Sequence, residues 1–173
     1  MSFNPQVVEK REYDLIDEGL YGAKVARIIE LGDQETKYGV KSQVVIGFTI
    51  PSLTVEVGDE MKQRMMWTFP MNQTSNPDSK LMKYIKAIKA DAVHMNELIN
   101  QPCMLEIAHT DPKPDGTIYA NISNITKPMA GMEIDDADID TFMYEFENGE
   151  DEVFDQLGEY RQKQIREAVN FGG

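Results

Sequence analysis

Two pairs of apolar segments, each joined by a turn that contains glycine, dominate the first 128 residues. In the first pair, segments 19–31 and 42–50 flank the polar turn of residues 32–39. In the second pair, segments 102–109 and 117–125 flank the turn of residues 111–116. β-Branched and aromatic segments separated by such turns are typical of β-hairpins. The pattern therefore predicts two hairpins. The continuous apolar runs 28–31 and 44–50 further indicate strands that are buried on both faces.

Between the hairpins, the pattern predicts a third strand over residues 61–70 and a helix over residues 80–90. Pro51 is predicted to end the second strand. Asp78 or Ser79 can cap the helix. One helix face carries the apolar side chains Leu81, Tyr84, Ile85 and Ile88. Strand, strand, strand, helix, strand, strand is the element order of the OB-fold. We therefore predict a mainly β protein with helices, an OB-fold-like five-stranded Greek-key barrel with a helix between strands 3 and 4.

The composition changes after residue 128. Residues 130–173 have a net charge of -10, whereas residues 1–129 have only -3 of the total of -13. Acidic and aromatic residues alternate over residues 133–155, which opposes burial because like charges repel. A helix is predicted over about residues 154–170. We divide the chain into residues 1–128, with an N-terminal arm at 1–18, and an acidic, partly helical and solvated C-terminal tail at residues 129–173.

The sequence lacks the motifs of the common enzyme classes. It has no phosphate-binding lysine loop, no glycine-rich dinucleotide turn and no Cys-x-x-Cys pair. His94 and His109 are isolated, and a surface hydrogen-bonding role is favoured for His109. Cys103, the single cysteine, lies in an apolar run and is predicted to be a buried thiol. We expect a non-enzymatic protein without metal or cofactor. With no signal peptide or membrane span, the cytoplasm is the expected compartment.

A basic stretch in this acidic chain is the main functional signal. Residues 62–89 have a net charge of +5 and include aromatic residues. Lysines can follow phosphates while exposed rings stack on unpaired bases, as in sequence-tolerant single-strand binders. The hairpin turns add candidates, because OB-folds bind oligonucleotides on strands 2–3 and on the loops between strands 1–2 and 4–5. The candidate nucleic-acid-binding residues are Lys24, Arg27, Lys37, Tyr38, Lys41, Lys62, Arg64, Trp67, Phe69, Lys80, Lys83, Lys113 and Tyr119.

Several of these residues also have a purely structural interpretation. Trp67 and Phe69 share a strand face with Met65, which is equally consistent with a place in the core. Tyr84 is expected to face the core, and the lysines that recur every three residues from Lys80 are also typical of a solvated helix face.

Segments 19–32, 37–41 and 44–50 resemble the opening of phage-encoded single-stranded DNA-binding proteins, and segments 98–109 and 115–125 resemble their later part. The resemblance covers residues 19–128. It implies an OB-fold that coats single-stranded DNA without strong sequence preference during DNA replication or recombination, in the cytoplasm of the host cell.

Proteins of this role commonly carry an acidic C-terminal tail, which recruits polymerase, helicase or primase and competes with DNA. Residues 133–155 look similar, although a mixed-charge helix follows them. The candidate partner-binding residues are Asp135, Asp136, Asp138, Asp140, Phe142, Tyr144, Phe146 and Phe154. The alternative is a non-enzymatic β-barrel interaction or structural protein that docks a partner through this tail without binding DNA. A homo-oligomer with Trp67 at its interface belongs to this alternative.

Overall fold

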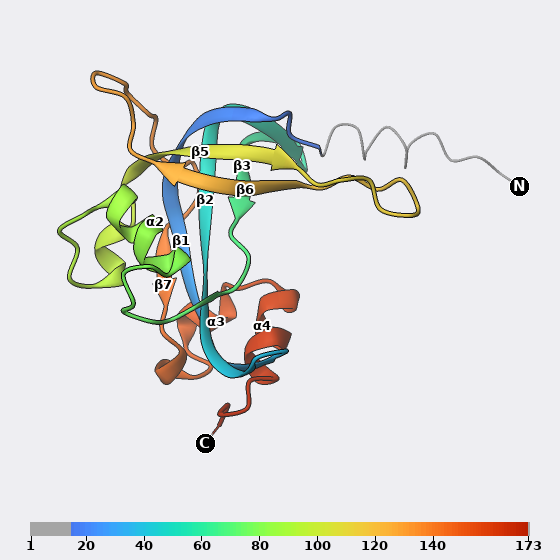
Figure 1. The fold of residues 1–173 in the computed structure, drawn as a ribbon, viewed down its shortest axis with the longest axis vertical. Coiled ribbons are helices and arrows are strands. Elements are labelled where there is room, and N and C mark those ends of the chain that lie inside the picture. Colours follow the sequence, from blue (N-terminus) through green and yellow to red (C-terminus); the bar gives the residue numbers. More distant parts are fainter. Residues whose placement is uncertain (1–14, 173) are drawn as a thin grey trace, which may run out of the picture.

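A curled, mainly antiparallel sheet dominates the computed structural model, which describes residues 15–172 (Figure 1). The prediction of a mainly β protein with helices is confirmed, while residues 1–14 of the predicted arm lie outside the described residues. The strands are β1 Gly19–Thr36, β2 Gly39–Val57, β3 Glu60–Trp67, β4 Met71–Asn72, β5 Pro102–His109, β6 Ala120–Thr126 and β7 Phe142–Tyr144. The helices are α2 Lys80–Ile88, α3 Glu152–Asp155 and α4 Glu159–Arg166, with 3-10 turns η1 Met95–Leu98 and η2 Phe146–Asn148.

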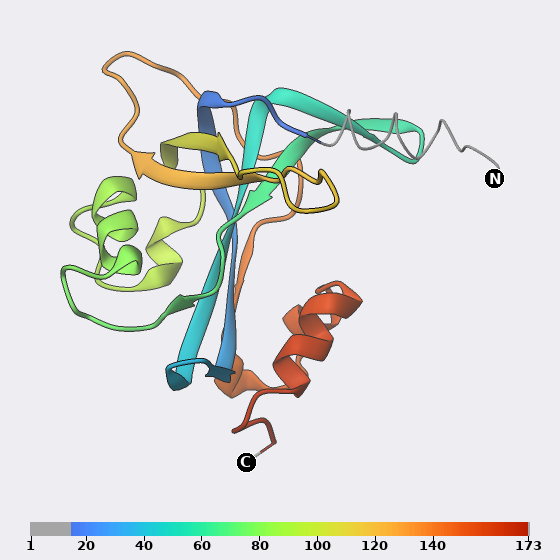
Figure 2. The same cartoon turned by 45° about the vertical axis from the view of Figure 1, so that its right-hand side comes forward.

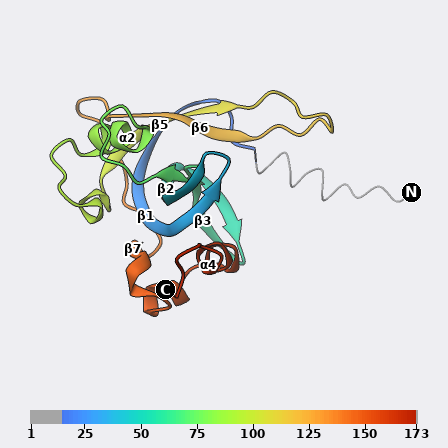
Figure 3. The same ribbon diagram turned by 60° about the horizontal axis from the view of Figure 1, so that its bottom comes forward.

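The sheet follows the order β3-β2-β1-β5-β6, with β4 paired to β2 and β7 paired to β1. The β1–β7 pair is parallel and the other pairs are antiparallel. Strands β3 and β6 form the two ends of the hydrogen-bonded path. The sheet curls until these two ends approach each other, as the view in Figure 3 shows.

The β1–β2 hairpin is long and buries apolar side chains on both faces. Shifts of register between Val25 and Arg27, and between Glu30 and Gly32, change which face successive β1 residues occupy. As a result, Val25 and Ile28 enter one core while Ile29 and Leu31 enter a second. The continuous apolar runs of the sequence therefore indicated strands buried on both faces, and this prediction is confirmed.

The main core lies inside the curl of the sheet and is closed by α2. Ser79 caps α2 by accepting a hydrogen bond from the Met82 N–H at 3.2 Å, as predicted. The buried helix face carries Leu81, Tyr84 and Ile88. Cys103 is buried here, and burial raises the pKa of its thiol to about 12, so the thiol is not a nucleophile at neutral pH.

The second core joins the C-terminal residues 129–173, which we call the C-terminal segment, to the outer face of the hairpin. Its buried members are Ile29, Leu31, Val45, Tyr144, Phe154, Leu157 and Ile165. The prediction of a solvated tail is therefore wrong for this part of the chain. Acidic and aromatic residues alternate along short strands and helical turns that differ in orientation. The aromatic rings therefore pack against the sheet, while the carboxylates stay exposed to solvent.

Two predicted boundaries also need correction. The helix expected over residues 154–170 is two helices, because Gly158 stands as the N-cap of α4 after α3 has ended. Strand β2 continues through Pro51, which lies at the register shift between Ile50 and Thr54. Proline is tolerated there because a bulged position needs no ladder N–H. Within residues 15–172, no helix has the length and apolar composition that a membrane span requires.

Phe154→Ala should destabilise the fold strongly, since Phe154 has no exposed surface and its ring packs 5.8 Å from that of Tyr144. We expect a loss of about 3–5 kcal/mol in the free energy of unfolding, measured by urea denaturation. Phe69→Ala is the matched control, because Phe69 is 62% exposed. Equal losses in the two variants would contradict a folded C-terminal segment.

The same core should make the protein sensitive to alkali. Burial raises the pKa of the Tyr144 hydroxyl from 10.0 to about 12, helped by the carboxylates of Asp151, Glu150 and Glu30. Because the folded pKa exceeds the unfolded one, this contribution to stability is complete below pH 10 and is lost as the pH rises towards 12. Tyr144→Phe should lose less stability over this interval in urea denaturation. An identical alkaline loss in both proteins would contradict the assignment.

Candidate nucleic-acid interface

A groove with a cavity volume of about 830 Å³ opens where the two ends of the sheet approach each other. Its walls come from β3, from the loop between β5 and β6, and from the two residues at the start of the described chain. We call it the β3–β6 groove. It is lined by Leu15, Ile16, Arg64, Met66, Asp115, Gly116, Thr117, Ile118, Tyr119 and Ala120.

Strand alternation directs Arg64 and Met66 into this groove. Their partners on β2 are Ile50 and Phe48, which both belong to the main core. Directly opposed side chains of an antiparallel pair lie on the same face. Arg64 therefore sits at the edge of the main core and brings a cationic side chain to an apolar wall.

The β5–β6 loop supplies the other wall and is held by its own hydrogen bonds. The Gly116 N–H donates to the Lys113 carbonyl at 2.7 Å, and the Tyr119 N–H donates to Thr110 Oγ1 at 3.0 Å. Lys113 Nζ lies 5.7 Å from the centre of the Tyr119 ring, which is half exposed. Ile118 is also partly exposed. The loop thus presents a cation, a ring and an apolar side chain together.

His109 fixes the third wall of the groove. Its Nε2 lies 2.7 Å from the Ile16 carbonyl oxygen, and its backbone N–H donates to the Glu18 carboxylate at 2.9 Å. These contacts hold Leu15 and Ile16 beside the end of β5. The histidine therefore has the hydrogen-bonding role favoured from the sequence.

A second group of predicted residues lies under the C-terminal segment. Lys24 Nζ forms a 2.9 Å ion pair with Asp136, and Arg27 Nε donates to the Asp140 carbonyl at 3.2 Å. The Arg27 guanidinium also lies 4.7 Å from the centre of the Phe142 ring, and burial lowers its pKa. In this conformation these two basic side chains bind the protein's own chain.

Trp67 belongs to the same covered face. Its ring lies on Gly47, where an added Cβ would come within 2.8 Å of the indole, and the Arg161 guanidinium of α4 is 5.0 Å from the ring centre. Trp67 is packed against the second core. Of the two interpretations left open by the sequence, the structure favours a packing role, since the indole lies between the sheet and α4.

The remaining basic and aromatic candidates do not line the groove. Lys37, Tyr38 and Lys41 belong to the β1–β2 turn region, at the opposite end of the molecule from the β5–β6 loop in Figures 1 and 2. Lys80 and Lys83 are on α2, which lies on the other side of the molecule from that loop. Lys62 pairs with Glu60 at 3.4 Å, and Phe69 is exposed.

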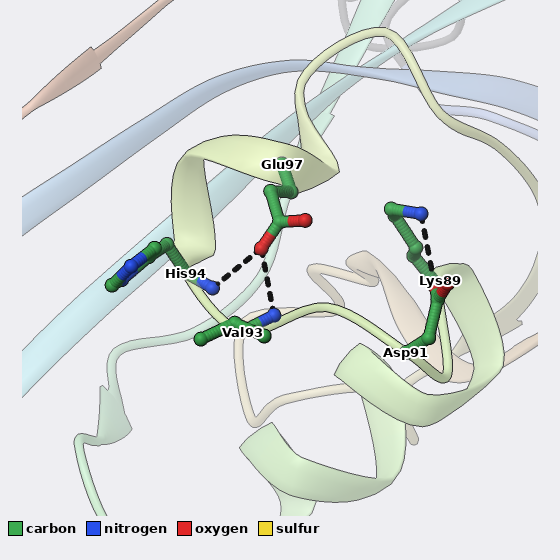
Figure 4. Close-up of polar contacts among 5 residues, drawn as sticks. All are labelled: Lys89, Asp91, Val93, His94 and Glu97. Atoms are coloured by element: carbon green, nitrogen blue, oxygen red, sulfur yellow. Dashed lines mark hydrogen bonds and ion pairs between the residues drawn. The ribbon is translucent and has the colours of Figure 1, made fainter.

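The turn that follows α2 is held by a compact set of polar contacts (Figure 4). Lys89 Nζ and Asp91 form a 2.9 Å ion pair, and Glu97 accepts the backbone N–H groups of Val93 and His94 at 2.7 Å each. These two hydrogen bonds lower the pKa of Glu97. The turn is thereby fixed, and Lys89 is neutralised by its partner.

The predicted partner-binding residues separate into two sets. The carboxylates of Asp135, Asp136, Asp138 and Asp140 are exposed. Phe142 and Phe146 are partly buried, while Tyr144 and Phe154 have no exposed surface. The prediction that Tyr144 and Phe154 contact a partner is therefore wrong for the folded chain. Their rings are buried inside the second core.

Met66, Thr117 and Ile118 are groove residues that sequence reasoning missed. The sequence assigned residues 117–119 to a strand, but β6 begins only at Ala120, so Ile118 lies on the loop side of the groove. The preceding turn contains two prolines and Gly116, and this composition could have indicated that the loop continues beyond residue 116.

Comparison of the chain with models of protein families and with curated proteins finds no match. The residues of the groove and the distribution of charge therefore carry the functional assignment.

Arg161→Ala should uncover the only tryptophan of the chain, because the Arg161 guanidinium lies over Trp67. We expect acrylamide to quench the Trp67 fluorescence more efficiently in this variant, with a loss of about 0.5–2 kcal/mol in folding stability. Lys163→Ala on the exposed side of α4 is the control. Unchanged quenching in Arg161→Ala would show that α4 does not cover the indole.

Proposed function

We propose that the chain is an OB-fold protein that binds single-stranded DNA in the β3–β6 groove without strong sequence preference. The observation that carries this proposal is that Arg64 from β3 and Tyr119 from the β5–β6 loop line one open, partly apolar groove, with Lys113 Nζ 5.7 Å from the Tyr119 ring centre. Cations that follow phosphates beside a ring that stacks on bases are the parts of a sequence-tolerant single-strand site.

The strand pairing supports the OB-fold part of the proposal. β1 pairs with both β2 and β5, β3 extends the first side, β6 extends the second, and α2 lies between β3 and β5 in the chain. In OB-folds, oligonucleotides bind across strands 2–3 and the loops joining strands 1–2 and 4–5. The β3–β6 groove corresponds to the third strand and the second of these loops.

The shape and chemistry of the groove favour an unpaired strand. Its volume of about 830 Å³ falls within the roughly 300–1,000 Å³ of typical ligand sites and gives room for an unpaired base. Asp115 lies on the loop wall and disfavours a phosphate beside it. We therefore place phosphates near Arg64 and Lys113, and a base against Tyr119 and Ile118.

The biological setting belongs to the same proposal. We infer that the protein coats single-stranded DNA during phage replication or recombination in the host cytoplasm. The exposed carboxylates of Asp135, Asp138 and Asp140 would then contact a basic surface of a polymerase, helicase or primase. In the alternative function, these carboxylates recruit a partner and the groove holds no DNA.

Tyr119→Ala should weaken the binding of a fluorescent oligo-dT by about 1–3 kcal/mol, the contribution typical of one stacked base. Arg64→Ala should weaken binding at low salt and reduce the slope of log K against log [salt] by about one, because one phosphate contact is lost. Fluorescence anisotropy at two salt concentrations measures both effects.

The controls for these variants are a ring and a charge outside the groove. Tyr160→Ala removes an exposed ring on α4, and Lys41→Ala removes a cation near the β1–β2 turn. Both variants should bind like the unchanged protein. If oligo-dT does not bind at all, the alternative function is favoured. If the four variants lose affinity equally, DNA binds outside the β3–β6 groove.

A further inference from the structure

Helix α2 presents three lysines to solvent on the side opposite its buried face. Lys80, Lys83 and Lys86 recur every three residues and span about 9 Å along the helix axis. We call them the lysine row. Among the residues that the structure describes, none of the three forms an ion pair, whereas Lys89 is neutralised by Asp91.

The lysine row lacks the features of a single-strand site. The only ring on α2 is that of Tyr84, which is buried in the main core, so no base can stack beside the lysines. The β5–β6 loop, which lines the β3–β6 groove, projects on the side of the molecule away from α2 (Figures 1 and 2). Lysines without a neighbouring ring fit an anionic protein surface better than an unpaired strand.

Such a surface exists in the C-terminal segment of the same chain. Residues 145–155 hold six carboxylates and no basic residue. Beside this stretch lies a cavity of about 360 Å³, which we call the C-terminal pocket and which is lined by Phe146, Glu147, Glu150, Asn170 and Phe171. The Phe146 and Phe171 rings meet edge to face with centres 6.2 Å apart. Glu150 is paired with Arg166 at 2.5 Å.

The C-terminal pocket has the chemistry that accepts a lysine side chain. Two phenyl rings can pack against the methylene stem and attract the ammonium through their π faces. Glu147 is exposed and, within residues 15–172, makes no ion pair, so its carboxylate can take the ammonium charge. A cation entering here also meets the surrounding negative charge of residues 145–155.

We propose that the C-terminal pocket of one copy binds the lysine row of a second copy, with Lys83 in the pocket and its ammonium on Glu147. Charge complementarity identifies the second copy as the occupant, because one chain carries both the acidic pocket and the unpaired lysines. The two surfaces are different patches at separate places on the molecule, so the contact is head-to-tail and can repeat in an open chain of copies.

This contact leaves the β3–β6 groove uncovered. Neither the lysine row nor the C-terminal pocket contributes a residue to that groove. Copies joined in this way could therefore follow a single strand side by side. The association itself depends only on the two charged surfaces, and it holds whether or not the groove binds DNA.

Sedimentation velocity of the full chain without DNA tests the association. At low salt, the sedimentation coefficient should rise with protein concentration, and at high salt it should return to that of a monomer, because the contact is between exposed charges. Lys83→Glu and Glu147→Lys should each weaken association at least about tenfold, since like charges then face each other. Lys127→Glu and Glu56→Lys, which reverse exposed charges elsewhere, should leave it unchanged.

Mixing the two charge-reversed variants gives the decisive result. In the equimolar mixture of Lys83→Glu and Glu147→Lys, each pocket can meet a helix whose charge at position 83 is opposite to its own. The two variants should therefore associate in alternation, although neither associates alone. A sedimentation coefficient that is independent of concentration in the unchanged protein, or a mixture that stays monomeric, overturns the proposal. It is also overturned if Lys83→Glu leaves association intact and instead weakens binding to an oligo-dT too short for two copies.

Discussion

The β1–β2 hairpin carries apolar side chains on both of its faces, and the rest of the chain is arranged to cover them. Val25 and Ile28 face the main core, which β5, β6 and α2 close. Ile29, Leu31 and Val45 face the other way and are covered by the C-terminal segment. Two glycines permit this close cover. Gly47 lies under Trp67, and Gly32, with a φ of 73°, lies under Phe146. The acidic end of the chain is thus an integral part of the fold.

Because both faces of the β1–β2 hairpin are covered, neither face is open to a ligand. The outer face of β1–β3 is occupied, because Asp136 pairs with Lys24 and α4 lies over Trp67. Among residues 15–172, the β3–β6 groove opens between the ends of the sheet, where Arg64 and Tyr119 both line it. The net charge of the chain therefore says little about this site. The negative charge is concentrated in the C-terminal segment, whose carboxylates stay in water while its rings are buried.

The strands, α2 and its cap could be predicted because hydrophobic periodicity, glycine turns and a capping serine are local signals. The position of the C-terminal segment could not, because burial of Tyr144 and Phe154 depends on partners more than 100 residues away on β1. For the same reason, the basic candidates could be chosen by residue type, but the sequence could not show which of them lie together in the fold. Lys24 and Arg64 look alike in the sequence, yet one lies under the C-terminal segment and the other lines the groove.

The central claim, that single-stranded DNA lies between β3 and the β5–β6 loop, is tested most directly by amide chemical-shift mapping with oligo-dT. The account predicts perturbed backbone resonances at Arg64, Met66 and residues 117–119, with those of α2 and of the second core unchanged. Perturbations confined to α2, or to the C-terminal segment, would contradict it.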